Sequence, residues 1–330
     1  MSVLTKASYE AIDARIREVV VGQEVAVERL LIGLLTGGHV LLQGMPGVAK
    51  TLLVHSLARS INLEFARVQF TIDLLPSDIV GCEILSQKGQ GFRLSRGPIF
   101  TNFLLADEIN RGAPKVQSAL LEAMQERRVT IAGKTLDLPV PFLVVATQNP
   151  VEMAGTFELP EAQLDRFMIC HRIHYPSPVV EEEIVGRSLG LGLRHEGNGA
   201  VPKTSFDSAE ESPPVVEREG LREMMEGVQR VHVSPVLIKH AVALAQLTRN
   251  VPEIEVPASP RAAMALVEGG RARAFLQGRD YAILDDVLEL VHDVLVHRIR
   301  PSHRALIAGR DSAAIVRDLV DQFLQDTRED

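Results

Sequence analysis

The feature that most constrains this chain is the stretch Gly-Met-Pro-Gly-Val-Ala-Lys-Thr at residues 44–51. It follows the phosphate-loop pattern of a glycine, four free positions and Gly-Lys-Ser/Thr, except that Ala49 replaces the second glycine. The flanks supply the required context, because an apolar run at 39–43 is typical of a buried strand and apolar side chains follow at helical spacing over 53–61. The order of strand, turn and helix predicts a loop that holds phosphate groups.

Each part of this loop has an expected role. Backbone N–H groups at a helix N-terminus favour anions, Lys50 would reach the outer phosphates, and the Thr51 hydroxyl would ligate magnesium. We therefore expect ATP or ADP and Mg²⁺ as cofactors. An ordinary strand–turn–helix corner is the alternative, and it leaves the lysine and threonine unexplained. The residues expected to contact nucleotide are Gly44, Met45, Pro46, Gly47, Val48, Ala49, Lys50, Thr51 and Leu52.

Length and charge limit the class of protein. A chain of 330 residues is long enough for two domains. The formal net charge of −8 argues against a surface dominated by contacts to a nucleic-acid backbone. No apolar run approaches the length of a membrane span and the N-terminus has no signal-peptide core, so we expect a cytoplasmic protein without a membrane span.

Apolar runs separated by helical segments indicate the fold class. They predict an α/β fold with a doubly wound parallel sheet and helices on both faces. Shorter alternating segments predict β-hairpins over 83–94, with its turn at Lys88-Gly89-Gln90, and over 129–138. The runs that we expect to form the sheet lie at residues 39–43, 65–70, 103–108, 142–147 and 168–175.

The character of the sequence changes after about residue 176. Residues 190–214 are rich in Gly, Pro, Ser and charge, so we expect a flexible linker or loop over 190–216. Helical patterns follow, with no strand pattern. We therefore predict a nucleotide-binding αβα domain over 1–189 and a small all-helical domain over 217–330.

Two carboxylates end the strand predicted at 103–108. Apolar residues precede Asp107 and Glu108, and the C-terminal edge of a parallel sheet is where ligands bind. Asp107 is suited to hold Mg²⁺ directly or through water, and Glu108 to orient and deprotonate the attacking water. Neighbouring strand residues point to opposite faces, so the two acids cannot share one role. A solvated pair at a strand end is the alternative.

Two further segments are candidates for nucleotide contact. Asn149 follows the strand at 142–147, where its amide can hydrogen-bond both a γ-phosphate and a water. The alternative is an asparagine that only caps the turn before Pro150. Near the N-terminus, Val21 and Gly22 belong to a turn that we expect to cover the base.

Two arginines are candidates for contact with another subunit. Arg166 just precedes the strand at 168–175, where it suits an arginine finger acting on a neighbour's phosphate; a surface ion pair with Asp165 is the alternative. Arg261 opens a helix of the second domain, where a surface salt bridge is again the alternative.

Five motifs in this order resemble the MoxR family of AAA+ ATPases, in the helix-2-insert clade. The resemblance extends from about Val20 to Arg300, and an alanine at position 49 is itself typical of that family's phosphate loop. The motifs are the phosphate loop, Leu104–Glu108, Ala146-Thr147-Gln148-Asn149-Pro150, Ala162-Gln163-Leu164-Asp165-Arg166-Phe167 and Ala258-Ser259-Pro260-Arg261.

The resemblance implies an ATPase that forms a hexameric ring with nucleotide between subunits and a helical lid. The resemblance leaves two assignments open. Because the family's lid is displaced, Arg261 acts either on the nucleotide of its own subunit or on that of a neighbour. The main trans arginine is either Arg166 or Arg111. By position, Lys50 and Thr51 are Walker A residues, Asp107 and Glu108 Walker B residues, Asn149 the first sensor, Arg166 the finger and Arg261 the second sensor.

The resemblance also implies a chaperone-like role. Family members remodel, assemble or activate protein clients together with von Willebrand factor A domain proteins, and the two predicted hairpins correspond to elements that line the pore. Residues 190–214 are longer than the family pattern leads us to expect. No residue identifies the client.

Two other functions stay open. One is a nucleic-acid motor, because related helix-2-insert ATPases include DNA helicases; the acidic total charge argues against nucleic acid as a partner. The other is a nucleotide-gated scaffold with little turnover. The basic residues that would contact phosphates in the motor are Lys88, Arg93, Arg96, Arg127, Arg128 and Lys134.

Overall fold

The computed structural model describes residues 2–85, 91–150, 155–196 and 199–329. Its centre is a five-stranded parallel sheet in the order β2-β5-β8-β1-β9. Each apolar run expected in the sheet forms one of its strands, so the predicted parallel αβα fold is confirmed. The strands are β1 (Val40–Gly44), β2 (Phe65–Gln69), β5 (Phe103–Asp107), β8 (Leu143–Gln148) and β9 (Ile169–Ile173).

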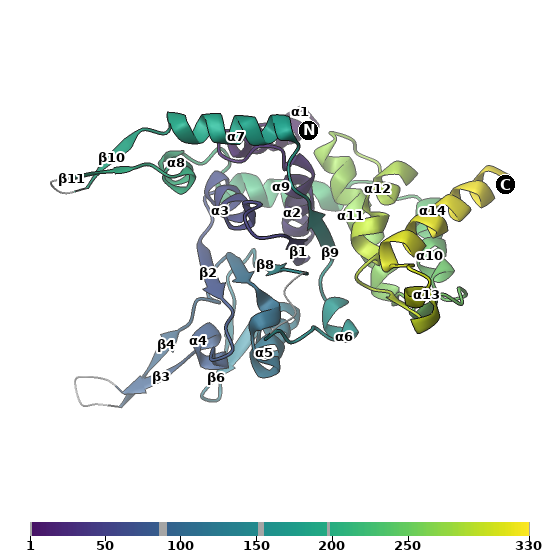
Figure 1. Ribbon diagram of the computed structural model, residues 1–330, viewed down its shortest axis with the longest axis horizontal. Helices are drawn as coiled ribbons and strands as arrows, with labels where there is room; N and C mark the ends of the chain where they lie inside the picture. The colour runs from purple at the N-terminus through teal and green to yellow at the C-terminus, as the bar shows by residue number, and fades with distance from the viewer. Residues whose placement is uncertain (1, 86–90, 151–154, 197–198, 330) are drawn as a thin grey trace.

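Helices cover both faces of this sheet (Figure 1). Strand alternation explains the two layers: Leu42 packs into the core that includes α2 and α3, whereas Leu41 packs into the core that includes α5. The first face carries α1 (Ser2–Arg17), α2 (Glu24–Thr36) and α3 (Lys50–Ser60), and the second carries α4 (Pro76–Val80) and α5 (Pro114–Glu126).

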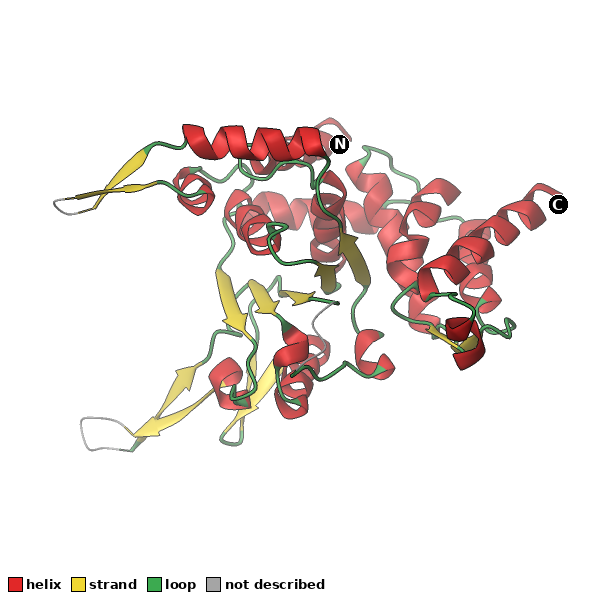
Figure 2. Ribbon diagram, in the orientation of Figure 1, coloured by secondary structure: helices red, strands yellow, loops and turns green. Residues whose placement is uncertain are grey.

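Two antiparallel hairpins project from the sheet, as predicted (Figure 2). The first consists of β3 (Gly81–Leu85) and β4 (Phe92–Arg96), and its predicted turn at 88–90 lies outside the described residues. The second consists of β6 (Arg128–Ile131) and β7 (Lys134–Asp137). The hairpins contact each other through β3 and β6, so they form one surface at that end of the molecule.

The segment predicted as a flexible linker, 190–216, instead carries regular structure. Helix α7 (Pro178–Gly190) leads into an antiparallel pair, and α8 (Ser205–Glu211) follows. The pair consists of β10 (Leu193–Glu196) and β11 (Gly199–Pro202). A capping box begins α8, because the Thr204 N–H donates to the Asp207 carboxylate at 2.6 Å and the Asp207 N–H to the Thr204 hydroxyl at 3.3 Å.

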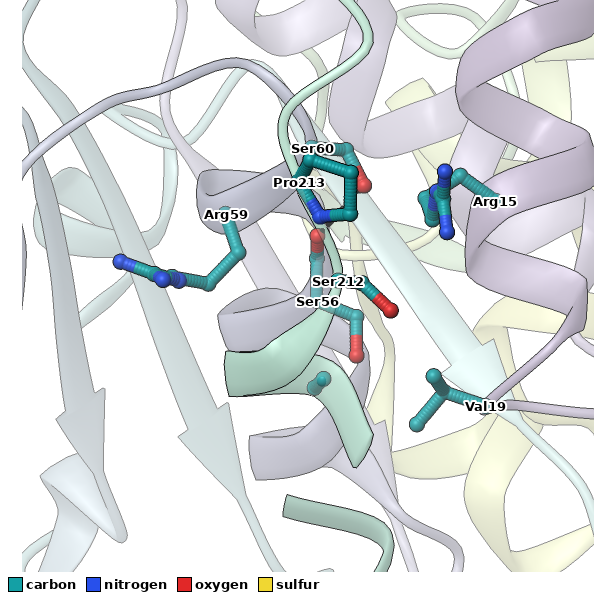
Figure 3. Close-up of a pocket in the computed structure, with 8 residues that line it drawn as sticks. Arg15, Val19, Ser56, Arg59, Ser60, Ser212 and Pro213 are labelled. Atoms are coloured by element: carbon teal, nitrogen blue, oxygen red, sulfur yellow. Dashed lines mark hydrogen bonds between the residues drawn. The ribbon is translucent and has the colours of Figure 1, made fainter. Parts of the chain in front are cut away.

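This segment is docked against α3. The Arg59 guanidinium donates to the Glu210 carbonyl at 3.0 Å, and the Val215 N–H donates to the Ser60 carbonyl at 2.9 Å. Figure 3 shows Ser212 and Pro213 beside α3, with Arg15 of α1 on the other side of a small cavity. The linker prediction is therefore wrong: residues 193–196 and 199–202 form an antiparallel pair, α8 is a regular helix, and the bonds at Glu210 and Val215 tie the end of the segment to α3.

The C-terminal part is mainly helical, as predicted. A short antiparallel pair, β12 (Ile254–Val256) and β13 (Arg300–Pro301), departs from the all-helical prediction. Over the described part of the chain, no helix is both long and apolar enough to cross a membrane. The helices are α9 (Arg218–Arg230), α10 (Pro235–Leu247), α11 (Pro260–Leu276), α12 (Leu284–Leu295), α13 (His303–Ile307) and α14 (Ser312–Glu329).

These helices share a hydrophobic core with the first face of the sheet. Helices α9 and α11 pack on α2, and α12 packs on β9. A buried ion pair crosses the junction, since the Arg29 guanidinium of α2 lies 2.7 Å from the Asp293 carboxylate of α12. The lid is consequently fixed to the sheet edge at β9.

Candidate nucleotide site

The phosphate loop joins the end of β1 to the start of α3. Ala49, at the position of the second glycine, has φ 59° and ψ 24°, which is the left-handed conformation that glycine adopts without strain. An alanine there costs about 1–2 kcal/mol. The backbone of the loop therefore keeps the shape that the strict pattern requires although its sequence departs from that pattern.

Lys50 lies inside this loop. Its ammonium donates to the carbonyls of Gly44 at 2.6 Å and of Met45 at 3.0 Å. The loop lines a cavity of about 550 Å³, large enough for a nucleotide. The predicted residues lining it are Pro46, Gly47, Val48, Ala49, Lys50, Thr51, Leu52, Asp107, Glu108 and Asn149.

The two acids reach this cavity through a turn in the backbone. Strand β5 ends at Asp107, and Glu108 takes the left-handed conformation with φ 55°. This turn ends the strand alternation, so both carboxylates line the same cavity, contrary to the expectation of opposite faces. Their surroundings still differ, because 10% of the Asp107 side chain is exposed and 31% of the Glu108 side chain.

Asp107 is held by three neighbours. The Thr147 hydroxyl donates to Oδ1 at 2.5 Å, and the Arg67 guanidinium donates to Oδ2 at 2.6 Å. The Thr51 hydroxyl lies 3.5 Å from the same Oδ2. A hydroxyl and a carboxylate oxygen this close are the oxygen ligands that Mg²⁺ prefers, so Thr51 and Asp107 fit the expected metal.

Glu108 is also paired within the chain. The Gln69 amide donates to its Oε2 at 2.8 Å, and the Arg111 Nε lies 3.1 Å from the same oxygen. Arg111 belongs to the short helix η1 (Ile109–Arg111), and its ion pair with Glu108 lies within one chain. Asn149 is buried beside these groups at the end of β8.

Sequence reasoning missed four residues of this cavity. Arg67 and Thr147 lie inside strands that read as apolar runs, and Ser205 and Phe206 belong to the segment predicted as a linker. A charged residue inside an otherwise apolar strand run is the sequence signal that could have identified Arg67. The Thr-x-x-Asp spacing at 204–207 is the signal that could have identified α8.

Val21 and Gly22 are not among the described residues that line this cavity. Gly22 has φ 74°, and a side chain there would meet Val180 of α7 at 2.9 Å. The turn is thus fixed against α7, and its contact with the base stays a prediction.

Arg166 and Arg261 line a different cavity, of about 470 Å³. Among the described residues, neither lines the phosphate-loop cavity. Gly37, Gly38 and His39, which precede β1, also line this second cavity, so it lies at the amino-terminal edge of the sheet. The structure brings the two arginines together and separates them from the phosphate loop of their own subunit.

Asp165 ties Arg261 to the segment that carries Arg166. It adjoins Arg166 in the chain, and its Oδ2 lies 3.6 Å from the Arg261 guanidinium. The Arg166 guanidinium donates instead to the Leu121 carbonyl at 2.9 Å. The Ser259 hydroxyl donates to the same carboxylate at 2.9 Å, and Arg298 donates to it at 3.0 Å. Burial lowers the pKa of Arg298 to about 10, although the Asp165 carboxylate favours its charged form.

Arg298 also fastens the lid to the segment just before β9. Its guanidinium donates to the Phe167 carbonyl at 2.6 Å and to the Met168 carbonyl at 3.1 Å. His297 contacts the Phe167 carbonyl at 3.0 Å, and burial holds the pKa of this histidine well below its usual value. The second cavity therefore has a rigid wall shared by core and lid.

Four of the basic residues at the hairpins have contacts within the described part of the chain. Arg128 lies 3.0 Å from the Glu126 carboxylate, and Lys134 lies 3.6 Å from Glu83. Arg96 lies over the Phe100 ring at 5.0 Å. Arg93 is exposed, Arg127 donates to the Gly37 carbonyl, and Lys88 lies outside the described residues.

A parallel αβα sheet with a phosphate loop after β1, an acid-ended strand β5 separated from β1 by β8, and a helical lid defines an AAA+ type ATPase. Residues 39–169 match the family model "ATPase family associated with various cellular activities (AAA)", and residues 246–319 match "AAA lid domain". A crystal structure of a candidate ATPase from Cytophaga hutchinsonii ATCC 33406 superposes with a TM-score of 0.85 at 39% identity, covering 97% of this chain and 95% of that one.

Two curated relatives are similar to this protein over most of its length. Chaperone MoxR1 of Mycobacterium tuberculosis is 42% identical over 88% of this chain and 75% of its own length. The uncharacterised protein YeaC of Bacillus subtilis is 42% identical over 92% of this chain and 91% of its own length. The chain belongs to the MoxR family of AAA+ ATPases.

Proposed function

We propose that this chain hydrolyses ATP to ADP and phosphate at a site shared between neighbouring subunits. The observation that carries the proposal is the division of the predicted residues between two cavities at opposite edges of one sheet. Strand β1 has 5 residues, so the edges lie roughly 15 Å apart. Arg166 and Arg261 would then reach the nucleotide of a neighbour, in trans.

The residues predicted at the phosphate-loop cavity have distinct roles in this reaction. The loop N–H groups and Lys50 bind and orient the phosphates, and bound Mg²⁺, held by Thr51 and Asp107, would neutralise phosphate charge. Glu108 accepts the proton of the attacking water, and Asn149 orients that water. Arg166 of the adjacent subunit stabilises the negative charge that develops in the transition state.

We further propose a hexameric ring that uses hydrolysis to remodel, assemble or activate a protein client with a von Willebrand factor A domain partner. Membership of the MoxR family supports this role, and one relative is named a chaperone. The two hairpins lie side by side at one end of the subunit, where a ring could present them to a client.

Replacing the proposed base tests the reaction. In Glu108→Gln we expect steady-state hydrolysis to fall by about 10²–10⁴-fold while ATP binding is retained, because the amide cannot accept the proton. Glu64→Gln, an exposed acid paired with Arg218, is the matched control. Normal turnover in Glu108→Gln would reject the assignment, and ATP binding without turnover in the unaltered chain would favour a nucleotide-gated scaffold.

The same variant tests the proposed partner. Glu108→Gln should retain ATP and stay in the nucleotide state that binds the partner, so a purified von Willebrand factor A domain protein should co-purify with it in ATP and separate in ADP. Equal recovery in both nucleotides would argue against a nucleotide-driven complex.

A further inference from the structure

Arg67 occupies the face of Asp107 that the expected metal requires. Its Nε and Nη2 donate to Asp107 Oδ2 at 3.0 Å and 2.6 Å. The same Oδ2 is the oxygen nearest the Thr51 hydroxyl, at 3.5 Å. The other carboxylate oxygen, Oδ1, accepts a hydrogen bond from Thr147 at 2.5 Å. Oδ2 is therefore the oxygen that faces both Arg67 and the site of Thr51.

Oδ2 accepts two N–H bonds from Arg67, which occupy both of its lone pairs and leave none for a metal ion. Mg²⁺ binds its ligands at about 2.1 Å, or holds them through its bound waters, and either arrangement needs the space beside Oδ2. A guanidinium at hydrogen-bond distance from that oxygen would also repel the metal ion. Binding of the metal at Asp107 thus requires Arg67 to give up at least part of its contact.

Arg67 is able to move, whereas Asp107 is fixed. About 49% of the Arg67 side chain is exposed, against 10% for Asp107. Apart from Asp107, Arg67 donates to the exposed amide oxygen of Gln69 at 3.0 Å. Arg67 also lines the phosphate-loop cavity, so its released guanidinium would stay beside the nucleotide.

We propose that Arg67 is a resident counter-ion of Asp107 that Mg²⁺ displaces, and that this exchange sets the magnesium dependence of nucleotide binding. Arg67 is in this sense a positioning residue, because it acts through Asp107. The inference rests on the proposed function of this cavity as a Mg²⁺-nucleotide site.

The proposal predicts the sign of a measurable change. Removing Arg67 removes a competitor and a positive charge, and both effects favour Mg²⁺ at Asp107. Partly exposed ion pairs are weak, so the Mg²⁺ concentration at half-saturation should fall by about two- to fivefold. If Arg67 instead held Asp107 in place for the metal, its removal would raise that concentration.

The test is a titration of MgCl₂ into the full chain with fluorescent mant-ADP, which reports binding without hydrolysis. Arg67→Gln should shift the half-saturation to lower Mg²⁺, and Arg67→Lys, which keeps the charge without the two-nitrogen contact, should lie between it and the unaltered chain. Arg93→Gln, at an exposed arginine of β4, is the control for loss of one charge.

An unchanged half-saturation in Arg67→Gln, or a shift to higher Mg²⁺, would overturn the proposal. If Arg67→Gln does not fold, Arg67→Lys decides the question by the same shift. Failure of the proposed function is distinguishable, because mant-ADP would then show no magnesium-dependent binding to the unaltered chain.

Discussion

The two cavities of this subunit hold their charged groups in different ways. In the phosphate-loop cavity, Asp107 and Glu108 are paired with Arg67 and Arg111, whose side chains are 49% and 42% exposed. In the second cavity, Asp165 is paired with Arg298, whose side chain is 2% exposed. Exposed partners exchange easily, whereas a buried pair is lost only at a high cost in stability.

This difference matches the roles that we propose for the two sides. In the proposed reaction, the phosphate-loop side replaces protein contacts by contacts to nucleotide and metal in every cycle. The second side would hold Arg166 and Arg261 at a fixed distance from each other, because misplaced charges lose much of their effect on a transition state. Asp165 provides that connection, since it joins the segment before β9 to the lid.

The largest expected effect separates the two cavities by function. Arg166→Ala should lower hydrolysis by about 10³-fold or more, the usual contribution of an arginine finger, and leave mant-ADP affinity unchanged. Lys50→Ala should lose nucleotide binding itself. A similar loss of mant-ADP binding in both variants would contradict a difference in function between the two cavities.

The next effect concerns the rigidity of the second cavity. Asp165→Ala leaves the buried Arg298 guanidinium without its carboxylate, so the free energy of unfolding in urea should fall by about 3 kcal/mol. Glu161→Ala, which removes an exposed partner of Arg300 nearby, is the control and should change stability little. Equal effects of the two variants would show that the buried pair adds no rigidity.

A smaller effect is expected from pH. His39 lines the second cavity, its Nδ1 accepts from the Val144 N–H at 3.0 Å, and burial lowers its pKa to about 4. Below its usual pKa of 6.5, the unfolded chain binds a proton that the folded chain does not bind. Stability therefore falls as pH drops from 6.5 toward 4, by about 2 kcal/mol between pH 7.5 and pH 5.

Replacing this histidine isolates its contribution. His39→Gln should show a pH dependence of the unfolding free energy that is shallower by the same amount over that interval. Parallel curves for the variant and the unaltered chain would contradict a neutral, buried His39.

The smallest effect is expected from Ala49→Gly in the phosphate loop, and Ala49→Val is its larger contrast. Ala49→Gly relieves a left-handed alanine but adds freedom to the unfolded chain, so stability should change by less than about 1 kcal/mol. Nucleotide affinity should stay within about threefold. Ala49→Val should weaken mant-ADP binding strongly, because a β-branched residue resists this conformation. Equal affinities for both variants would mean that the loop tolerates another shape.

The sheet was predictable because its inner strands, β1, β5 and β8, are buried on both faces and are therefore nearly continuous apolar runs, such as 103–106 before Asp107. The acids, the phosphate loop and Asn149 were predictable because they occur at fixed places relative to such strands. Short strands without an apolar pattern, such as 193–196 and 199–202, carry no such signal, so the segment was interpreted as a linker.

Contacts between distant segments could not be derived from local patterns. Arg67 and Asp107 are 40 residues apart, and their pairing follows from the register of β2 beside β5. The same holds for Asp165 and Arg298, 133 residues apart. The separation of Arg166 from its own phosphate loop likewise depends on which edge of the sheet each segment reaches.

In the proposed site, one subunit supplies the phosphate loop and its neighbour supplies Arg166. The direct test mixes Lys50→Ala with Arg166→Ala in equal amounts, after co-purification confirms that the two variants assemble together. In a randomly mixed ring, about a quarter of the sites combine an intact Lys50 with an intact Arg166 from the adjacent subunit. We predict that the mixture regains a corresponding fraction of ATP hydrolysis although each variant alone is inactive. A mixture that assembles and stays as inactive as its components would contradict a site shared between subunits.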